Sequence, residues 1–568
     1  MFKTLLLSIV LTAHLGGDHV TRYLETRYPA PKPAEISAYI AAQKEDGSFS
    51  DIRYGDKKRS RWNDGYHINR FQALCLSYHY TGDQATLDAA RKALVWWTDR
   101  MPQCPNWFFN MIAAPRMTGV AALMVRDDLT PDEHARVLKI MDQCTFGKTG
   151  QNKVWQATNM LLKGLLTDDE GLVIAARDTI ASEIVITEKE GLQPDWSFHQ
   201  HGPQLQWGNY GLSYANSFAT LIHAFRGTPI AFSPEQEKII VDYVSEGLRW
   251  PVWKGRMDMS TCGRQIFKGQ QKSKGSSVLR IMKMLGIKDT PLIGGRYFPR
   301  SDFGIFRTAG WYGSVRMQSV RTIGFETTNK ENMRANFSAD GAVLVRVDGD
   351  EYKDVAPCWD WHHVPGVTAY DDGPLFGAKG KRPYNKSSRV FGKAGDDFLV
   401  AAMELERDGL HARKAWFFTP DGIVCLGAGI SMDKGFPVTT AVEQNHLRGE
   451  VKKGKNWYWH DSKAYVMLDK ARFSLAPAEH KGDWFAIAPY YSKDIVTQQL
   501  FDLYIEHGTN PSGASYAYMV LPVSADGKQA AGWVKKQVSV LSNNEALQSV
   551  RVAGRTFSID WNKQEISY

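Results

Sequence analysis

The chain has 568 residues, of which 43% are hydrophobic and 23% are charged, and its formal net charge is +8. This composition is ordinary for a globular protein, but the length exceeds what one compact core usually holds, so we expect at least two domains. The mild positive charge suits an acidic polymer as partner, whereas the absence of a Lys/Arg block argues against nucleic acid.

The N-terminal segment has the form of a secretory signal. Met1, Phe2 and Lys3 precede a short apolar run over residues 4–13, which is too short to span a membrane. We therefore expect a signal peptide at residues 1–20 and a secreted or periplasmic protein, with a buried N-terminal helix as the alternative. No later stretch is apolar for long enough to predict a transmembrane helix, so membrane insertion is not expected.

Residues from about 30 to 290 carry the pattern of successive amphipathic helices. Apolar residues recur at helical spacing, and the helix-start signature of an N-cap residue, a proline or acidic residue and a capping Glu or Gln occurs at Thr130–Glu133, Thr167–Glu170 and Ser233–Gln236. Short loops between helices of 12 to 18 residues predict helical hairpins that pack side by side.

After about residue 295 the pattern changes to short strands. Strand-like runs occur at 313–320, 342–347, 398–403 and 415–418, with Gly, Asp and Asn between them. This half is predicted to form stacked antiparallel sheets. We place the helical domain at residues 21–292 and the β domain at 293–568.

The six cysteines are scattered and contain no CxxC pair, which argues against a zinc module and a disulfide-dense scaffold. Isolated buried thiols are expected, with a single bridge as the alternative. They are Cys75, Cys104, Cys144, Cys262, Cys358 and Cys425.

The run from Trp196 to Gly211 is the most informative segment. It is rich in Gly, Pro, Gln and Asn, so it is predicted to be a loop, and loops on a rigid scaffold often carry catalytic groups. His201 and Tyr210 stand nine residues apart in it.

Four segments together resemble the polysaccharide lyases of family 8, the chondroitin AC, hyaluronate and xanthan lyases. The segments are Asn106–Asn110, Thr149–Asn152, the His201/Tyr210 run with Gly263–Ile266 after it, and Glu326–Asn332. Their order and approximate spacing agree with that family over about residues 60 to 370. The resemblance implies an incomplete α/α toroid followed by a β-sandwich, and an enzyme that cleaves a uronic-acid polymer by β-elimination.

The resemblance also implies catalytic roles. Asn152 would neutralise the substrate carboxylate, as a donor does in an oxyanion hole. Tyr210 would remove the proton next to that carboxylate as a phenolate and return it to the leaving oxygen. A phenol has an ordinary pKa of about 10, and Arg264 is expected to lower it. His201 would orient the substrate or be an alternative base, and Glu326 would orient His201 or Arg264.

Further residues are expected to bind substrate. Lys268 and Phe108 depart from the family, which often has Arg and Trp there, and lysine lacks the bidentate fork of arginine. The expected substrate-binding residues are Trp107, Phe108, Gln204, Trp207, Lys268 and Asn329. We expect those from both halves to line one cleft with the catalytic residues.

Each assignment has a structural alternative. Asn152 could be a helix N-cap, Arg264 an ion-pair partner between domains, and Tyr210 or Trp107 a core residue. Glu331 lies close enough to Glu326 to take its role.

Alternative functions also remain. The leading hypothesis is an exported lyase of a glucuronate-containing polysaccharide of the chondroitin or hyaluronan type, most simply a monomer. The alternatives are a lyase of another polyuronide of the xanthan or alginate type, a glycoside hydrolase with Asp195 and Glu326 as its carboxylates, and a non-catalytic glycan-binding protein. No cofactor is required, and a structural cation is left open. Histidine pairs at 199/201 and 362/363 lack a spaced third ligand, so no catalytic metal is expected.

Overall fold

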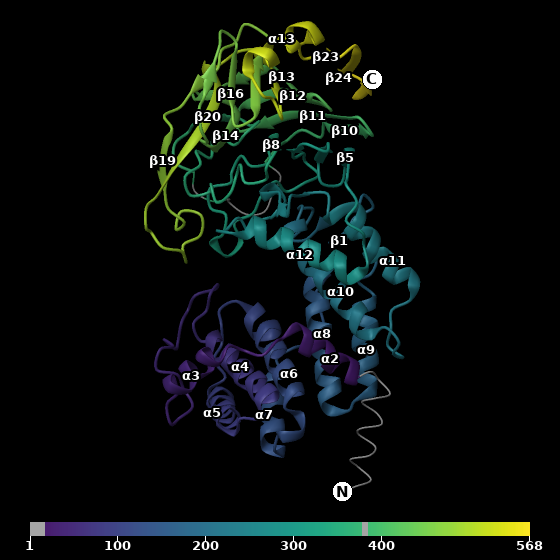
Figure 1. Cartoon of the computed structure of the whole chain (residues 1–568), viewed down its shortest axis with the longest axis vertical. Helices are drawn as coiled ribbons and strands as arrows, with labels where there is room; N and C mark the ends of the chain where they lie inside the picture. Colours follow the sequence, from purple (N-terminus) through teal and green to yellow (C-terminus); the bar gives the residue numbers. More distant parts are fainter. Residues whose placement is uncertain (1–16, 376, 378–383) are drawn as a thin grey trace. The chain divides into compact units, whose positions relative to one another are not determined.

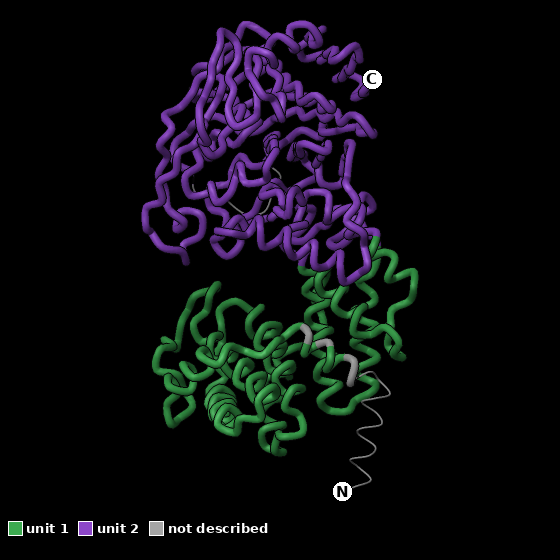
Figure 2. Tube along the Cα trace, viewed as in Figure 1, with its two compact units in different colours: residues 1–185, 213–241 green, residues 186–212, 242–568 purple. Residues whose placement is uncertain are grey.

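The computed structural model describes residues 17–375, 377 and 384–568 (Figure 1). The predicted signal peptide at residues 1–20 lies almost wholly outside these residues. The chain forms two compact units, shown in Figure 2: the first comprises the chain up to Val185 together with Ser213–Val241, and the second comprises Ile186–Leu212 and Asp242–Tyr568.

The first unit is helical. Its helices alternate with short loops, as the sequence predicts. They are α2 (Gly17–Arg27), α3 (Pro33–Ala42), α4 (Gly65–Thr81), α5 (Gln84–Arg100), the π-helical turn η1 (Phe109–Ala113), α6 (Ala114–Met124), the 3-10 turn η2 (Arg126–Asp128), α7 (Pro131–Met141), α8 (Gly150–Thr167), α9 (Glu170–Ala181), most of α10 (Leu212–Phe225) and most of α11 (Pro234–Tyr243).

The predicted helix starts are confirmed with one shift. Thr130 and Glu133 form a reciprocal capping box at α7, and Ser233 and Gln236 bond to each other's backbone N–H in the same way at α11. At α9 the cap is Asp169, whose side chain accepts from the N–H of Leu172. The expected start at Thr167 is wrong because α8 continues through that residue.

The second unit begins with short elements and one long helix before its sheets. These are β1 (Gly191–Leu192), β2 (Phe198–His199), the π-helical turn η3 (Trp207–Gly211), a second π-helical turn η4 (Val244–Leu248), β3 (Val252–Trp253), β4 (Arg256–Met257), the 3-10 turn η5 (Met259–Thr261), α12 (Gln270–Leu285) and, between later strands, the 3-10 turn η6 (Thr328–Lys330).

Antiparallel sheets make up most of the rest of this unit, drawn teal to yellow in Figure 1. One sheet has the order β5 (Gly294–Phe298), β6 (Phe303–Arg307), β7 (Tyr312–Arg316), β8 (Ala342–Arg346). The largest has the order β10 (Val390–Gly395), β11 (Phe398–Arg407), β12 (Leu410–Thr419), β13 (Gly422–Met432), β21 (Ala514–Leu521), β17 (Lys463–Met467), β16 (Trp457–His460), β15 (Lys452–Lys453). A third contains β18 (Ser474–Leu475), β20 (Val496–Thr509), β14 (Pro437–His446) and β9 (Thr368–Tyr370), with β19 (Glu479–Gly482) also on β20. The last follows α13 (Gly527–Gln537) and contains β22 (Val538–Asn543), β23 (Leu547–Val552), β24 (Arg555–Asp560) and β25 (Glu565–Ser567).

Strand β11 shows why this half has continuous apolar runs. Leu399, Ala401 and Met403 point into one core, while Val400 and Ala402 point into a second core on the opposite face of the same sheet. Successive side chains of a strand alternate between faces, so a strand covered on both faces is apolar throughout.

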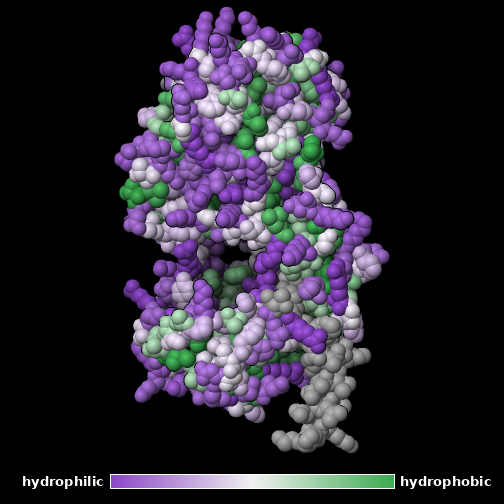
Figure 3. Space-filling model, in the orientation of Figure 1, coloured by the Kyte–Doolittle hydropathy of each residue, from purple (hydrophilic) through white to green (hydrophobic). Residues whose placement is uncertain are grey.

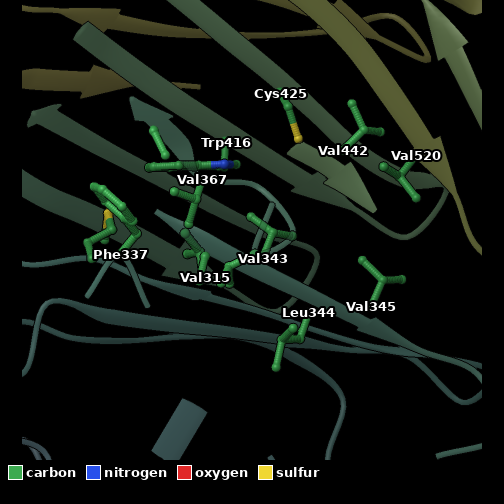
Figure 4. Close-up of a cluster of buried hydrophobic side chains, with 14 of the residues drawn as sticks. Val315, Phe337, Val343, Leu344, Val345, Val367, Trp416, Cys425, Val442 and Val520 are labelled. Atoms are coloured by element: carbon green, nitrogen blue, oxygen red, sulfur yellow. The ribbon is translucent and has the colours of Figure 1, made fainter. Parts of the chain in front are cut away.

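The two cores have different partners. The first packs the largest sheet against β7, β8, β9, β14 and β20, and Figure 4 shows part of it around Trp416, Val343 and Val315. The second packs the largest sheet against α13 and the C-terminal sheet, with Trp561 fully buried. The sheets are therefore stacked in layers.

The predicted fold class is confirmed in its order, with a helical N-terminal part followed by antiparallel sheets. The change from helix to strand occurs where β5 begins, whereas the compact units divide the chain elsewhere, so the domain boundary at 292/293 stays a prediction. All six cysteines are free and buried. In the part of the chain that the structure describes, no helix is long and apolar enough to cross a membrane. Polar residues predominate on the face shown in Figure 3.

Candidate active site

Tyr210 lies in a π-helical turn rather than in a loop. The turn η3 is closed by a hydrogen bond of 2.9 Å from the N–H of Gly211 to the carbonyl of Gln206, and α10 continues from it. The loop prediction for this part of the run is wrong. The Gly and Asn residues are typical of a loop, but here they form the first turn of a helix that continues as α10. Single π-helical turns occur often at functional sites, where the wider turn redirects a side chain.

Trp207 fixes this turn to the core. Its side chain is fully buried, its Nε1 donates to the carbonyl of Trp196 at 3.1 Å, and its ring meets Phe298 and Phe303 edge to face. The predicted role of Trp207 in substrate binding is therefore wrong, because the packing leaves none of it exposed. Gln204 is also fully buried, and its predicted contact with substrate stays a prediction.

Glu326 is the centre of a buried hydrogen-bond network. Nδ1 of His201 lies 2.9 Å from each of its carboxylate oxygens, Nη1 of Arg264 donates to Oε1 at 2.8 Å, and Nε2 of Gln206 donates to Oε1 at 3.0 Å. The hydroxyl of Thr328 donates to Oε2. Because the side chain of Glu326 has no exposed surface, each of these contacts is largely desolvated.

The network keeps Glu326 ionised. Burial alone would raise its pKa, but the hydrogen bond from His201, the charge of Arg264 and the hydrogen bond from Thr328 outweigh burial and lower the pKa to about 2. An ionised Glu326 can only accept hydrogen bonds. It therefore requires a proton on Nδ1 of His201.

The Nδ1 atom of His201 faces Glu326, whereas its Nε2 atom does not. With its proton on Nδ1, the neutral imidazole carries its lone pair on Nε2, which has no hydrogen-bond partner within the described ranges. The ring meets that of Tyr210 at 4.8 Å between centroids, with 62° between the planes. His201 also has a φ of 63°, a left-handed conformation that is uncommon outside glycine but is more frequent for histidine than for most residues.

Arg264 lies beside the phenol ring and between two carboxylates. Its Cζ is 5.7 Å from the ring centroid of Tyr210, and its Nε donates to Oε2 of Glu331 at 2.7 Å, besides the bond to Glu326. Burial would lower the pKa of Arg264, but Tyr210, Glu326 and Glu331 raise it above the ordinary value. Arg264 therefore carries its charge throughout the usable pH range.

Burial and charges of both signs determine the pKa of Tyr210. Burial raises this pKa above its ordinary value of 10.0, and Glu326 and Glu331 raise it further; the charge of Arg264 and its hydrogen bond to the phenol lower it without reversing the direction. Arg264 therefore lowers the pKa of Tyr210, as expected, but burial together with Glu326 and Glu331 outweighs it, so the net shift is upward.

Lys274 of α12 bonds the π-helical turn η3 to its surroundings. Its buried Nζ donates to the carbonyl of Gly208, within η3, and to Oε1 of Gln265 at 2.8 Å. Burial lowers the pKa of Lys274. This buried lysine therefore satisfies a carbonyl two residues before Tyr210.

Three of the predicted residues belong to the first unit. Asn152 is the third residue of α8, and the N-cap is Thr149, so the alternative role of Asn152 as a cap is wrong. Its side chain makes no hydrogen bond to any described residue, which leaves its amide free to donate. Trp107 is 37% exposed, and Lys148 Nζ lies 4.4 Å from its ring centroid. Phe108 is half-buried between Trp107 and Trp155.

The other predicted residues belong to the second unit. Of these, the structure brings together His201, Tyr210, Arg264 and Glu326. Lys268 is exposed, and Asn329 is half-buried in η6 with a φ of 61°. A common cleft with Asn152, Trp107 and Phe108 stays a prediction, as do the substrate contacts of Lys268 and Asn329.

Comparison with known proteins identifies the family. Residues 32–291 match the family model for the N-terminal α-helical domain of polysaccharide lyase family 8, and residues 293–531 match the model for its super-sandwich domain. Chondroitinase-AC of Pedobacter heparinus is 31% identical over 555 residues, which cover 89% of this chain and 79% of that protein. The chain belongs to polysaccharide lyase family 8.

Other relatives agree with this membership. A hyaluronate lyase of Thermasporomyces composti is 23% identical over 596 residues, covering 88% of this lyase and 76% of the relative. A solved chondroitinase AC lyase from enzyme–oligosaccharide complexes has a TM-score of 0.88 and 29% identity, covering 97% of this chain and 89% of that one. The chain is thus a polysaccharide lyase, and its helical and β-sandwich parts are those of the family.

The rival sites have structural roles in this lyase. Nε2 of His199 lies 2.9 Å from the hydroxyl of Ser301, and Asp195 accepts from the backbone N–H of Ser197 and of Arg300. The pair His362/His363 is bonded to aspartates. Among the residues that the structure describes, no three His, Cys, Asp or Glu side chains gather in a form that could hold a metal ion.

Several residues of the site are not predicted from the sequence. The sequence offers Glu331 as a substitute for Glu326, whereas in the structure both contact Arg264. The polar residues inside the His201/Tyr210 run were a usable signal for Gln206, but nothing near Lys274 or Tyr490 pointed to the site. The residues missed are Gln206, Lys274, Thr328 and Tyr490.

Proposed function

We propose that this lyase is exported and cleaves a glucuronate-containing glycosaminoglycan of the chondroitin or hyaluronan type by β-elimination. The relatives named chondroitinase-AC and hyaluronate lyase support the substrate class. The observation that carries the mechanism is the pairing of Glu326 with both His201 and Arg264, directly beside Tyr210.

The reaction begins with the acidity of the proton next to the carboxylate. A charged carboxylate makes this proton hard to remove, because negative charge accumulates on the carboxylate oxygens as the proton leaves. The amide of Asn152 donates a hydrogen bond to those oxygens, and a fixed donor of this kind stabilises such charge strongly. The free side chain of Asn152 at the start of α8 supports this role.

Tyr210 then moves the proton. Its phenolate takes the proton from the carbon, the C–H electrons form a C=C bond in the uronate ring, and the bond to the glycosidic oxygen breaks. The phenol returns its proton to that oxygen. The products are an unsaturated uronate and a new hydroxyl end, so atoms and charges balance without a cofactor.

Arg264 and His201 assist this transfer in different ways. Arg264 stabilises the phenolate, and its position beside the Tyr210 ring supports that role. The raised pKa of Tyr210 means that few molecules hold a phenolate at neutral pH, but the phenolate that forms is a stronger base. His201, held by Glu326 with its proton on Nδ1, has the lone pair of Nε2 available to accept a proton, so it is the second candidate for the base.

A panel of acidic polysaccharides tests the proposed substrate. Chondroitin, hyaluronan, xanthan and alginate would be incubated with the lyase, and products would be followed by ultraviolet absorption and by new reducing ends. We expect ultraviolet-absorbing products from chondroitin or hyaluronan. Products from xanthan or alginate alone would replace the glycosaminoglycan by another polyuronide, and reducing ends without absorption would indicate hydrolysis.

Location and assembly remain part of the proposal. The apolar run after Lys3 supports export to the periplasm or the medium. We propose that the lyase acts as a monomer on an acidic polysaccharide, without nucleic acid and without membrane insertion. Fractionation of the producing cells and the mass of the purified enzyme in solution test these statements.

A further inference from the structure

A second carboxylate determines the position of Arg264. Nη1 of Arg264 donates to Glu326 at 2.8 Å, and Nε donates to Glu331 at 2.7 Å. The guanidinium is therefore held at two of its three nitrogens. A planar guanidinium held at two corners has little freedom to rotate. The side chain of Arg264 is only 8% exposed, so water does not replace either carboxylate easily.

Tyr490 holds Glu331 from the opposite side. The phenol of Tyr490 donates to Oε1 of Glu331 at 3.0 Å, while Oε2 receives Arg264. The segment 487–490, which contains Tyr490, also bonds to the backbone just after Glu331. The N–H of Met333 donates to the carbonyl of buried Ile487 at 3.1 Å. Both the side chain of Glu331 and the backbone behind it are therefore fixed by the 487–490 segment.

The 487–490 segment also contacts the loop that carries Arg264. Phe267, three residues after Arg264, meets the ring of Tyr490 at 5.8 Å between centroids, with 71° between the planes. Edge-to-face pairs of this kind add to the stabilisation from burial. Tyr490 thus contacts Glu331 directly and, through Phe267, the loop that carries Arg264, although it is distant from both in the sequence.

We propose that Tyr490 is a positioning residue of the elimination reaction, acting through Glu331 to hold the guanidinium of Arg264 beside the phenol of Tyr210. This inference rests on the proposed function, in which Arg264 stabilises the phenolate. Tyr490 does not touch the reacting atoms in this account. Its loss allows Glu331 to move and Arg264 to follow it, and the phenolate loses part of its stabilisation.

The charge of Glu331 gives the proposal a pH signature. The groups that face it are Arg264, Tyr210, Glu326, Tyr490 and Lys274. Burial raises the pKa of Glu331, while Arg264 and the hydrogen bond from Tyr490 lower it. Removal of that hydrogen bond therefore raises the pKa further, so Glu331 loses its charge at a higher pH as the solution is acidified.

The test compares Tyr490→Phe, Glu331→Gln and their double variant with the unmodified lyase. Tyr490→Phe removes one hydrogen bond to a charged group, which corresponds to about a 10-fold loss of kcat, with KM within about twofold. The acid limb of its kcat profile should move to higher pH. Glu331→Gln should lower kcat at least as much, and the double variant should lose little more than Glu331→Gln alone, because both changes break one linkage.

Two controls separate the possible failures. Tyr491→Phe removes a neighbouring hydroxyl that does not bond to Glu331, and its ring also packs on Phe267, so kcat and the pH profile should stay unchanged. Tyr210→Phe reports on the proposed function: retained turnover there would contradict the mechanism itself. With Tyr210→Phe inactive, an unchanged kcat and pH profile in Tyr490→Phe, or losses that add fully in the double variant, would overturn the role of Tyr490.

Discussion

Nδ1 of His201 lies 2.9 Å from both carboxylate oxygens of Glu326, although 125 residues separate the two in the chain. This contact fixes the imidazole tautomer and joins the segment before α10 to the loop at the head of η6. The same carboxylate receives Arg264, so one buried acid orients both neighbours of Tyr210.

The low pKa of Glu326 predicts a stability difference that depends on pH. Its folded-state pKa of about 2 lies below the ordinary 4.5, so the charge stabilises the fold fully above about pH 4.5 and this stabilisation is lost as the pH falls to about 2. The shift corresponds to about 3 kcal/mol. Glu326→Gln should therefore be less stable than the unmodified lyase at neutral pH, and the difference should shrink on acidification.

Chemical denaturation at neutral pH, near pH 5 and near pH 3 measures this difference. Glu406→Gln, which removes an exposed carboxylate of β11, is the matched control and should show little change at any pH. A destabilisation of Glu326→Gln that is the same at all three values would show that shape, not charge, explains it.

Much of the fold could be predicted because its signals are local. The capping box at Thr130 and Glu133 depends on residues three apart in the chain. The continuous apolar run of β11 is likewise visible in a short stretch of sequence, and it reflects the burial of both faces of the strand. The site was harder. Trp207 and Tyr210 belong to one run of the sequence, but only contacts with Phe298 and Phe303 decide that Trp207 is core.

The electrostatics of the site could not be predicted from residue types alone. The pair of Arg264 and Tyr210 suggested a lowered phenol pKa, and the structure reverses the direction because burial, Glu326 and Glu331 act against the arginine. Tyr490 could not be found at all, since nothing in the sequence relates it to Glu331. Such effects depend on which distant segments meet.

Asn152 provides a test of carboxylate neutralisation. Asn152→Ala should reduce turnover by about 10²–10³ while leaving the fold intact, because its side chain bonds to no described residue and Thr149 is the helix cap. Asn152→Asp is the matched variant of nearly the same size. It should be at least as damaging, since its charge repels the substrate carboxylate; normal turnover in either variant would remove Asn152 from the mechanism.

Arg264 and Lys268 should affect different kinetic constants. Arg264 is buried beside Tyr210, so Arg264→Ala should lower kcat steeply at any salt concentration. Lys268 is exposed, so Lys268→Ala should mainly raise KM, and this effect should shrink as salt screens exposed charges beyond about 8 Å. Lys268→Arg should keep KM low because the charge remains. Equal, salt-sensitive losses of binding in both alanine variants would mean that Arg264 only holds the polymer.

Tyr210→Phe tests the central claim most directly, because it removes the hydroxyl that moves the proton and keeps the ring between His201 and Arg264. The measurement is the rate of ultraviolet-absorbing product formation from chondroitin and hyaluronan, together with the thermal stability of the variant. We predict nearly complete loss of product formation with almost unchanged stability. Product formation at the rate of the unmodified lyase would contradict it and would assign the base to His201 or to another group.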